Sequence, residues 1–311
     1  MALSAPLPVV RARRASQKRA AARTTWQAYA LIAPAGILYT LFQLVPIVGA
    51  FVLSFTSWNG INLGRITFTG FDNYVRLVQD EQFWQSALHN VVFAALVFVF
   101  MTFGSFLIAA IIHAGIRGGA FFRIVFFAPV VISSVAVAML AIFFFSPSQG
   151  LINEILRTIG LGGLAQPWLG SNEWALPSVA ATYILQNFGF SMILFLSALS
   201  QVNDEMCEAA EVDGASQGRI LWGIVLPSIR PIASVVVLLG FINSFRLFDT
   251  VYVMTGGGPF HASDTIVTYL YRTAFGGNQV GYASAIGVAL FVILGVIAVV
   301  QLRLTRERGE S

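Results

Sequence analysis

The sequence predicts an all-α polytopic membrane protein with six transmembrane helices, and two observations support this fold class. Hydrophobic residues make up 57% of the 311 residues and charged residues only 10%. A soluble domain carries about 25% charged residues, so this chain has too few of them to cover a water-exposed surface. Its apolar residues also gather into separate runs that reach the roughly 20 residues needed to cross a bilayer.

The amino-terminal tail, residues 1–26, contains six basic residues and no acidic one. Its other residues are mostly small or polar, so we expect a disordered basic tail. The apolar run that follows is too long for the core of a cleavable signal peptide and has no clear cleavage site. We therefore interpret it as a retained span that opens a single six-span domain at 27–305, followed by a short tail at 306–311.

Six apolar runs give the expected positions of the membrane helices. Two charged residues, Arg246 and Asp249, interrupt the fifth run, whereas the other five runs contain no Asp, Glu, Lys or Arg. A turn signal, Gly256-Gly257-Gly258-Pro259, follows it. The runs lie at 29–55, 88–112, 124–145, 175–199, 232–253 and 281–302.

The basic residues predict the orientation of these spans. Six spans place both tails on the same side as the loops 113–123 and 200–231. Six basic residues in the first tail, two in each loop and three near the carboxyl terminus put 13 of the 18 on that side. Because basic residues favour the cytoplasmic ends of spans, we expect both termini in the cytoplasm. The same bias explains the net charge of +4 without a nucleic-acid partner.

Metal, cofactor and catalytic sites are not predicted for this chain. Cys207 is the only cysteine, which excludes an intrachain disulfide and a cysteine-built metal site. The three histidines are far apart and show no ligand spacing. The only lysine, Lys18, does not follow a Gly-x-x-x-x-Gly sequence, so the chain has no P-loop.

The loop 200–231 is acidic, against the trend of its side, with five acidic and two basic residues. Asn203 or Asp204 can cap a helix whose acidic first turn suits the helix dipole. Gly214 can end that helix in a left-handed turn. A second short helix is expected to start near Ser216 and to stop before Pro227. The residues alone fit a solvated acidic linker as well as a docking element.

Polar side chains at membrane depth are candidates for a transport path. In the fourth span Tyr183, Gln186, Asn187 and Phe190 share one helical face. Hydrogen bonding between helices would explain the same pattern equally well. The fifth span adds Asn243, Ser244 and Arg246. Arg246 and Asp249, three residues apart, are expected to pair with each other rather than with a ligand.

The acidic loop resembles the EAA loop of permease subunits of binding-protein-dependent ABC importers. It carries Glu208-Ala209-Ala210, Asp213-Gly214-Ala215 and Ile224-x-Leu226-Pro227. Phe71-x-x-Tyr74, the stretch 150–169 and Thr255-Gly256-Gly257-Gly258-Pro259 resemble the maltose-type carbohydrate branch. The similarity covers about residues 25–305.

This resemblance implies a permease that forms half of a path for a sugar or oligosaccharide in a prokaryotic plasma membrane. The EAA loop would seat in a cleft of a cytoplasmic ATPase, with Glu208 against a basic residue and Gly214 at the turn. Ala209, Ala210, Ile220 and Leu226 would pack in that cleft. The implied partners are a second permease, two copies of the ATPase carrying ATP and Mg, an extracytoplasmic solute-binding protein and membrane lipid.

Three other functions are alternatives for this sequence. The cargo could be a glycerol phosphate ester or another polar solute, with Arg246 binding an anion. An intramembrane serine protease needs Gly-x-Ser-Gly and a histidine within a span; the nearest sequence, Gly189-Phe190-Ser191-Met192, has the wrong last residue. A membrane scaffold without transport activity is the third.

Overall fold

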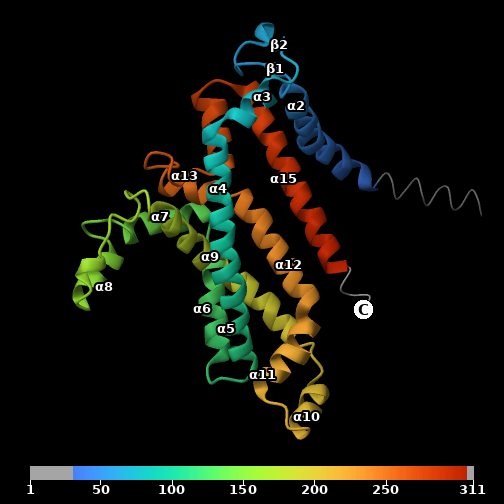
Figure 1. The fold of residues 1–311 in the computed structure, drawn as a ribbon, viewed down its shortest axis with the longest axis vertical. Coiled ribbons are helices and arrows are strands. Elements are labelled where there is room, and N and C mark those ends of the chain that lie inside the picture. Colours follow the sequence, from blue (N-terminus) through green and yellow to red (C-terminus); the bar gives the residue numbers. More distant parts are fainter. Residues whose placement is uncertain (1–30, 307–311) are drawn as a thin grey trace, which may run out of the picture. The chain divides into compact units, whose positions relative to one another are not determined.

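The computed structural model describes residues 31–306, which are mostly helical (Figure 1). The predicted tail at 1–26 and all but the first residue of that at 306–311 lie outside the described residues. The contacts divide the chain into two units, Met1–Leu53 and Ser54–Ser311. Within the first unit the helix Leu31–Leu53, which includes η1 (Thr40–Leu44) and α2 (Val45–Leu53), is long and apolar enough to cross a membrane.

The second unit begins with polar and amphipathic elements. A two-stranded antiparallel sheet pairs Thr56 with Phe68 and Ser57 with Thr67. The short amphipathic helix α3 comes next, and such helices typically lie at a membrane interface. These elements are β1 (Thr56–Ser57), η2 (Leu63–Arg65), β2 (Thr67–Phe68) and α3 (Asp72–Gln79).

Four further long apolar helices of the second unit match predicted spans. They cover 81–113, 175–199, 217–245 and 280–306. The bent pair α6–α7 counts as a sixth span if its two halves are taken together. The elements are α4 (Glu81–Leu96), η3 (Val97–Phe103), α5 (Gly104–His113), α9 (Ala175–Leu199), α11 (Gln217–Ile220), η5 (Leu221–Val225), α12 (Leu226–Phe245) and α15 (Val280–Arg306).

The third predicted span, 124–145, is not one straight helix. It consists of α6 (Gly119–Val131) and α7 (Ser134–Phe144), which meet at 103°. Pro129 removes one backbone donor near the end of α6, and Ile132 is extended. The Ile132 carbonyl, no longer used by a helix, accepts a hydrogen bond from Gln186 Nε2 at 2.9 Å.

The fifth predicted span, 232–253, is also broken. α12 ends at Phe245, and α13 (Asp249–Met254) starts after a three-residue interruption. At its other end the helix runs through Pro227 without a stop, so the expected end before this proline is wrong. The π-helical turn η5 precedes Pro227, and Ser228 Oγ donates to the Ile224 carbonyl at 2.7 Å. This local widening accommodates the proline ring.

The second unit is held together by three groups of buried apolar side chains. They lie between α4, α7, α9 and α13, between α5, α9 and α12, and between α4, α14 (Ile266–Tyr271) and α15. The backbones of α9 and α6 approach each other closely at Gly189, where a Cβ atom would meet the Phe126 carbonyl of α6. Small residues permit such contacts between membrane helices.

Two groups of connecting elements lie at opposite ends of the second unit. In Figure 1, α10 (Asp204–Val212) and α11 lie at the opposite end from the two strands and α3. The remaining elements are α8 (Leu151–Thr158), η4 (Gly162–Leu164) and η6 (Arg272–Gly276).

Candidate functional site

A polar cavity of about 350 Å³ lies where the two helix breaks meet α9. It brings together five of the seven residues that the sequence suggests for a transport path. The break between α12 and α13 turns backbone and side chains toward α9, which a continuous helix would not do. The lining residues are Ser134, Tyr183, Gln186, Asn187, Asn243, Arg246, Leu247, Phe248, Asp249 and Thr250.

The other two suggested residues do not line this cavity. Phe190 is 44% exposed and lies further along α9. Ser244 is fully buried, and its Oγ donates to the Gly240 carbonyl at 2.7 Å. Its own carbonyl accepts a hydrogen bond from Asn90 Nδ2 at 2.8 Å. Ser244 therefore joins α12 to α4.

The two amides of α9 differ in what holds them. Gln186 is buried and donates to the Ile132 carbonyl, so it fixes the bend between α6 and α7. Asn187 is half-buried and donates to the Tyr183 carbonyl of its own helix at 2.9 Å. Since this bond involves no other element, the Asn187 side chain can face a ligand without loss of an interhelical contact. The packing interpretation fits Gln186 better, and the ligand interpretation fits Asn187 better.

The expected pair between Arg246 and Asp249 does not form: within residues 31–306 these two side chains make no ion pair. Asp249 Oδ2 instead accepts from Ser134 Oγ at 3.0 Å, which joins α13 to the start of α7. Both charged side chains are exposed and line the cavity. Opposite charges at one cavity wall suit a neutral, hydroxyl-rich solute, whose hydroxyl groups can accept hydrogen bonds from Arg246 and donate them to Asp249.

The acidic loop folds as two helices joined by a tight turn. The Asn203 side chain caps α10 by accepting from the Glu205 backbone N–H at 2.9 Å. Gly214 has a φ of +81°, and the next residue, Ala215, donates its backbone N–H to the Ala210 carbonyl at 2.9 Å. Gln217 Nε2 then donates to Glu211 Oε1 at 2.5 Å. The cap, the left-handed turn and this side-chain bond fix α11 against α10.

Three large apolar side chains on the outer surface of this loop are exposed, and none of them belongs to the sequence motifs described above. Met206, Val212 and Trp222 are 56%, 88% and 67% exposed. Ile220, in contrast, is buried within the chain, so it is not available to pack in a partner's cleft as expected. Large apolar side chains in an otherwise acidic loop were the sequence signal that could have found these three residues.

The protease alternative is not supported by the surroundings of Ser191. This residue is 1% exposed and lies within α9. Gly189, two residues earlier, packs against the α6 backbone. A hydrolytic serine needs access to water and a nearby base, and this position offers no water access.

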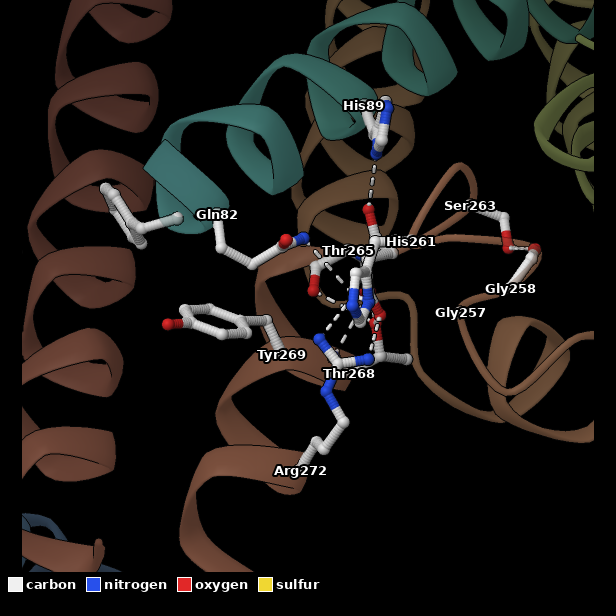
Figure 2. Close-up of polar contacts among 12 residues, drawn as sticks. Gln82, His89, Gly257, Gly258, His261, Ser263, Thr265, Thr268, Tyr269 and Arg272 are labelled. Carbon is white, nitrogen blue, oxygen red and sulfur yellow. Dashed lines mark hydrogen bonds and ion pairs between the residues drawn. The ribbon is translucent and has the colours of Figure 1, made fainter. Parts of the chain in front are cut away.

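A second polar cluster, which sequence reasoning missed, surrounds the carboxylate of Asp264, and Figure 2 labels its partners His261, Thr268 and Arg272. Its carboxylate is fully buried. Arg272 binds both oxygens, with Nη2 at 2.5 Å from Oδ2 and Nη1 at 3.2 Å from Oδ1. His261 Nδ1 lies 2.9 Å from Oδ2, and Thr268 Oγ1 lies 3.1 Å from Oδ1. The cluster connects the loop after α13 to α14 and η6.

Asp80, the cap of α4, forms another carboxylate centre at the same end of the second unit. It accepts from Tyr269 at 2.5 Å, from Tyr282, and from the backbone N–H groups of Gln82 and Phe83. Burial raises the pKa of Asp80, but these hydrogen bonds outweigh it and hold the pKa below its ordinary value of 3.8. Burial and the bond to Asp80 raise the pKa of Tyr269 to about 12.

Asp80 therefore predicts an acid-dependent loss of stability. Because its folded-state pKa is lowered, its contribution is complete above pH 3.8 and is lost as the pH falls through the lower, folded-state value. We expect Asp80→Asn to lower the thermal unfolding temperature at neutral pH and to have a smaller effect in acid. Thermal unfolding of both proteins across acidic pH tests this; a difference that does not depend on pH would contradict it.

Comparison with known proteins places these sites in context. The model of one family, described as binding-protein-dependent transport system inner membrane component, matches residues 105–308. The probable ABC transporter permease protein YurN of Bacillus subtilis is 34% identical over 285 residues, covering 91% of this chain and 97% of YurN. The multiple sugar-binding transport system permease protein MsmF of Streptococcus mutans is 31% identical, covering 87% and 92%.

A solved structure is similar to this one over most of the chain. It is a bacterial alginate ABC transporter in complex with an alginate pentasaccharide-bound periplasmic protein. One of its chains is 27% identical to this one, with a TM-score of 0.79, and the match covers 92% of this chain and 96% of the other.

Proposed function

We propose a function from one premise: the chain belongs to the family of binding-protein-dependent transport system inner membrane components. It is a membrane-spanning permease subunit of an ABC importer, and as such not itself an enzyme. The cavity beside α9 is its half of the translocation path, and the cargo is a sugar or oligosaccharide. The observation that carries this proposal is a polar cavity, lined by amides, Tyr183 and Phe248, within apolar helices.

The chemistry of the cavity favours a sugar over the alternatives. Amide groups can pair with sugar hydroxyls, and aromatic rings can pack against the faces of a sugar ring. MsmF belongs to a multiple sugar-binding transport system, which supports the same class. A glycerol phosphate ester would need an excess of positive charge, whereas Arg246 is balanced by Asp249 in the cavity wall. The neutral cargo is therefore preferred.

The acidic loop is the proposed contact with a separate ATPase, which would carry ATP and Mg. Met206, Val212 and Trp222 expose apolar surface at the end of the second unit that holds this loop. Glu208, Ala209 and Gly214 are exposed beside them. Burial of such apolar surface drives most protein association. We place this end of the second unit in the cytoplasm, and the opposite end then faces the solute-binding protein. With six spans, both termini lie on the same side of the membrane as this loop, which is the cytoplasm.

A second permease subunit is needed in this proposal, because one chain supplies only one cavity wall and one coupling loop. Two ATPase subunits would then serve two loops. The solved alginate transporter was captured with a periplasmic protein, which supports a soluble binding protein as the donor of cargo here. A scaffold without transport activity predicts instead that cargo never stimulates ATP hydrolysis by the assembled complex.

The double variant Asn187→Ala and Asn243→Ala tests the path. Each amide can supply hydrogen bonds of about 0.5–1.5 kcal/mol, so we expect uptake into proteoliposomes to fall about tenfold while the complex assembles normally. Ser284→Ala is the matched control, because Ser284 is half-buried like Asn187 and its Oγ donates to the Val280 carbonyl of its own helix, α15, outside the cavity. Unchanged uptake in the double variant, or equal loss in the control, would reject the assignment.

A further inference from the structure

A second, larger cavity lies on the side of the helices away from the transport path. It is a groove of about 840 Å³ between α4 with η3, α12 and α15. Its walls are almost entirely aliphatic and aromatic. They include Val91, Phe98, Val237, Phe241, Phe245 and Val296. None of these residues lines the polar cavity beside α9, so the groove needs an occupant other than the cargo.

The polar groups of the groove gather at one end. Arg230 and Ser234 lie near the start of α12, and Gln301 lies near the end of α15. Gln301 Nε2 donates to the Ser234 carbonyl at 2.8 Å and joins the two helices there. The sixteen residues from Arg230 to Phe245 span about 22 Å along α12. One leaflet of the hydrocarbon core is about 15 Å deep, so the groove has the length of a lipid chain.

Arg230 is half-buried at the mouth of this groove. No acidic side chain of the described part of the chain, residues 31–306, lies within ion-pair distance of it. A guanidinium binds phosphate through two parallel hydrogen bonds, and basic pockets between membrane helices on the cytoplasmic side bind anionic lipid head groups. The charge at one end and the apolar walls beyond it match the two parts of a phospholipid.

We propose that this groove binds one anionic glycerophospholipid, with its phosphate on Arg230 and an acyl chain along α12. An apolar helix of another subunit would fill the walls but would leave the Arg230 charge without a counter-charge at the membrane surface. In the proposed orientation the lipid belongs to the cytoplasmic leaflet. Because α12 continues through η5 into α11 of the coupling loop, the lipid would contact the helix that carries motion from that loop.

The test uses the permease purified with its partner subunits and reconstituted in nanodiscs of phosphatidylcholine with or without phosphatidylglycerol. Native mass spectrometry then measures the lipid retained on the complex. We expect preferential retention of phosphatidylglycerol, about fivefold weaker in Arg230→Gln, the loss expected from one basic residue at a membrane surface. Arg230→Lys should retain most of the binding, and Ala233→Phe, which fills the groove, should lose both lipids.

Arg123→Gln is the matched control, because Arg123 is an exposed arginine of α6 outside the groove. It should leave lipid retention unchanged. A phosphatidylglycerol with a photoreactive acyl chain should label the peptide that contains Val237 and Phe241. The proposal is overturned if Arg123→Gln lowers retention as much as Arg230→Gln, or if the wild type shows no preference for the anionic lipid. Crosslinking of Val237 to a protein segment in place of lipid would overturn it as well.

Discussion

Gly214→Val should lower coupled transport about tenfold or more while leaving the membrane helices inserted and assembled. Gly214 joins α10 to α11 with a φ of +81°, and no atom lies within 4 Å of the position of a Cβ at this residue. A valine would therefore act through the backbone alone. The left-handed conformation costs a non-glycine residue about 1–2 kcal/mol, and more for a β-branched one.

This cost falls on the contacts that orient the coupling loop. A shift of Gly214 out of the left-handed region breaks the bond from the Ala215 N–H to the Ala210 carbonyl. It also separates Gln217 from Glu211. The exposed surface around Glu208 would then no longer match the ATPase. A cost of about 1–2 kcal/mol lowers the ratio of the native turn to its alternative conformations about five- to thirtyfold.

The measurement is uptake together with cargo-stimulated ATP hydrolysis in proteoliposomes. We expect uptake to fall about tenfold or more, with stimulation by cargo lost. Gly115→Val is the matched control, because Gly115 has a φ of +84°, is exposed and has no atom within 4 Å of its Cβ position. It strains a different loop to the same degree. Normal uptake in Gly214→Val, or equal failure in Gly115→Val, would contradict a specific coupling role.

The features that the sequence predicted well are those with a local physical cause. Asn203 caps α10 because its side chain reaches the Glu205 N–H, and Gly214 adopts a left-handed turn because it lacks a Cβ. The fourth span was placed at 175–199, as observed, since its apolar run is bounded by polar segments. The family and its importer function followed from the loop motif, and the comparisons confirm both.

The features that could not be predicted depend on distant partners. A hydropathy run gives no sign that Ile132 leaves the helix, because the compensating donor is Gln186 on another span. Arg246 and Asp249 have the spacing of a helical pair, but the helix breaks between them and Asp249 binds Ser134. Ile220 has the spacing of a docking residue, but it packs inside the chain.

The Asp264 cluster is the clearest case of a feature without a local signal, and it gives the prediction with the largest effect on stability. Asp264 and Arg272 are eight residues apart, in a loop and a helix whose relation the sequence does not define. Asp264 is fully buried, whereas the Arg272 side chain is 37% exposed. Loss of a buried carboxylate leaves a partner charge and several hydrogen-bond donors unsatisfied, which costs about 3–5 kcal/mol when both partners are buried.

Asp264→Asn is therefore expected to destabilise the permease by about 3 kcal/mol, the low end of that range, because water can still reach part of Arg272. The new amide would also place an N–H₂ group against donors from Arg272 and His261. Gly257→Ala should act on the same carboxylate from the other side, because its Cβ would meet Asp264 Oδ1 and its φ is +90°. Both variants should lower the unfolding temperature of the purified complex.

A double-mutant cycle separates this cluster from a simple loss of packing. Asp264→Asn leaves the Arg272 charge unpaired, and adding Arg272→Gln removes that charge. The double variant should therefore be less destabilised than the sum of the two single variants. Glu154→Gln is the matched control, because it breaks the exposed ion pair with Arg157, a kind of pair worth about 0–1 kcal/mol. Additive losses in the cycle, or a loss in Asp264→Asn no larger than in Glu154→Gln, would show that the buried carboxylate does not hold this end of the permease together.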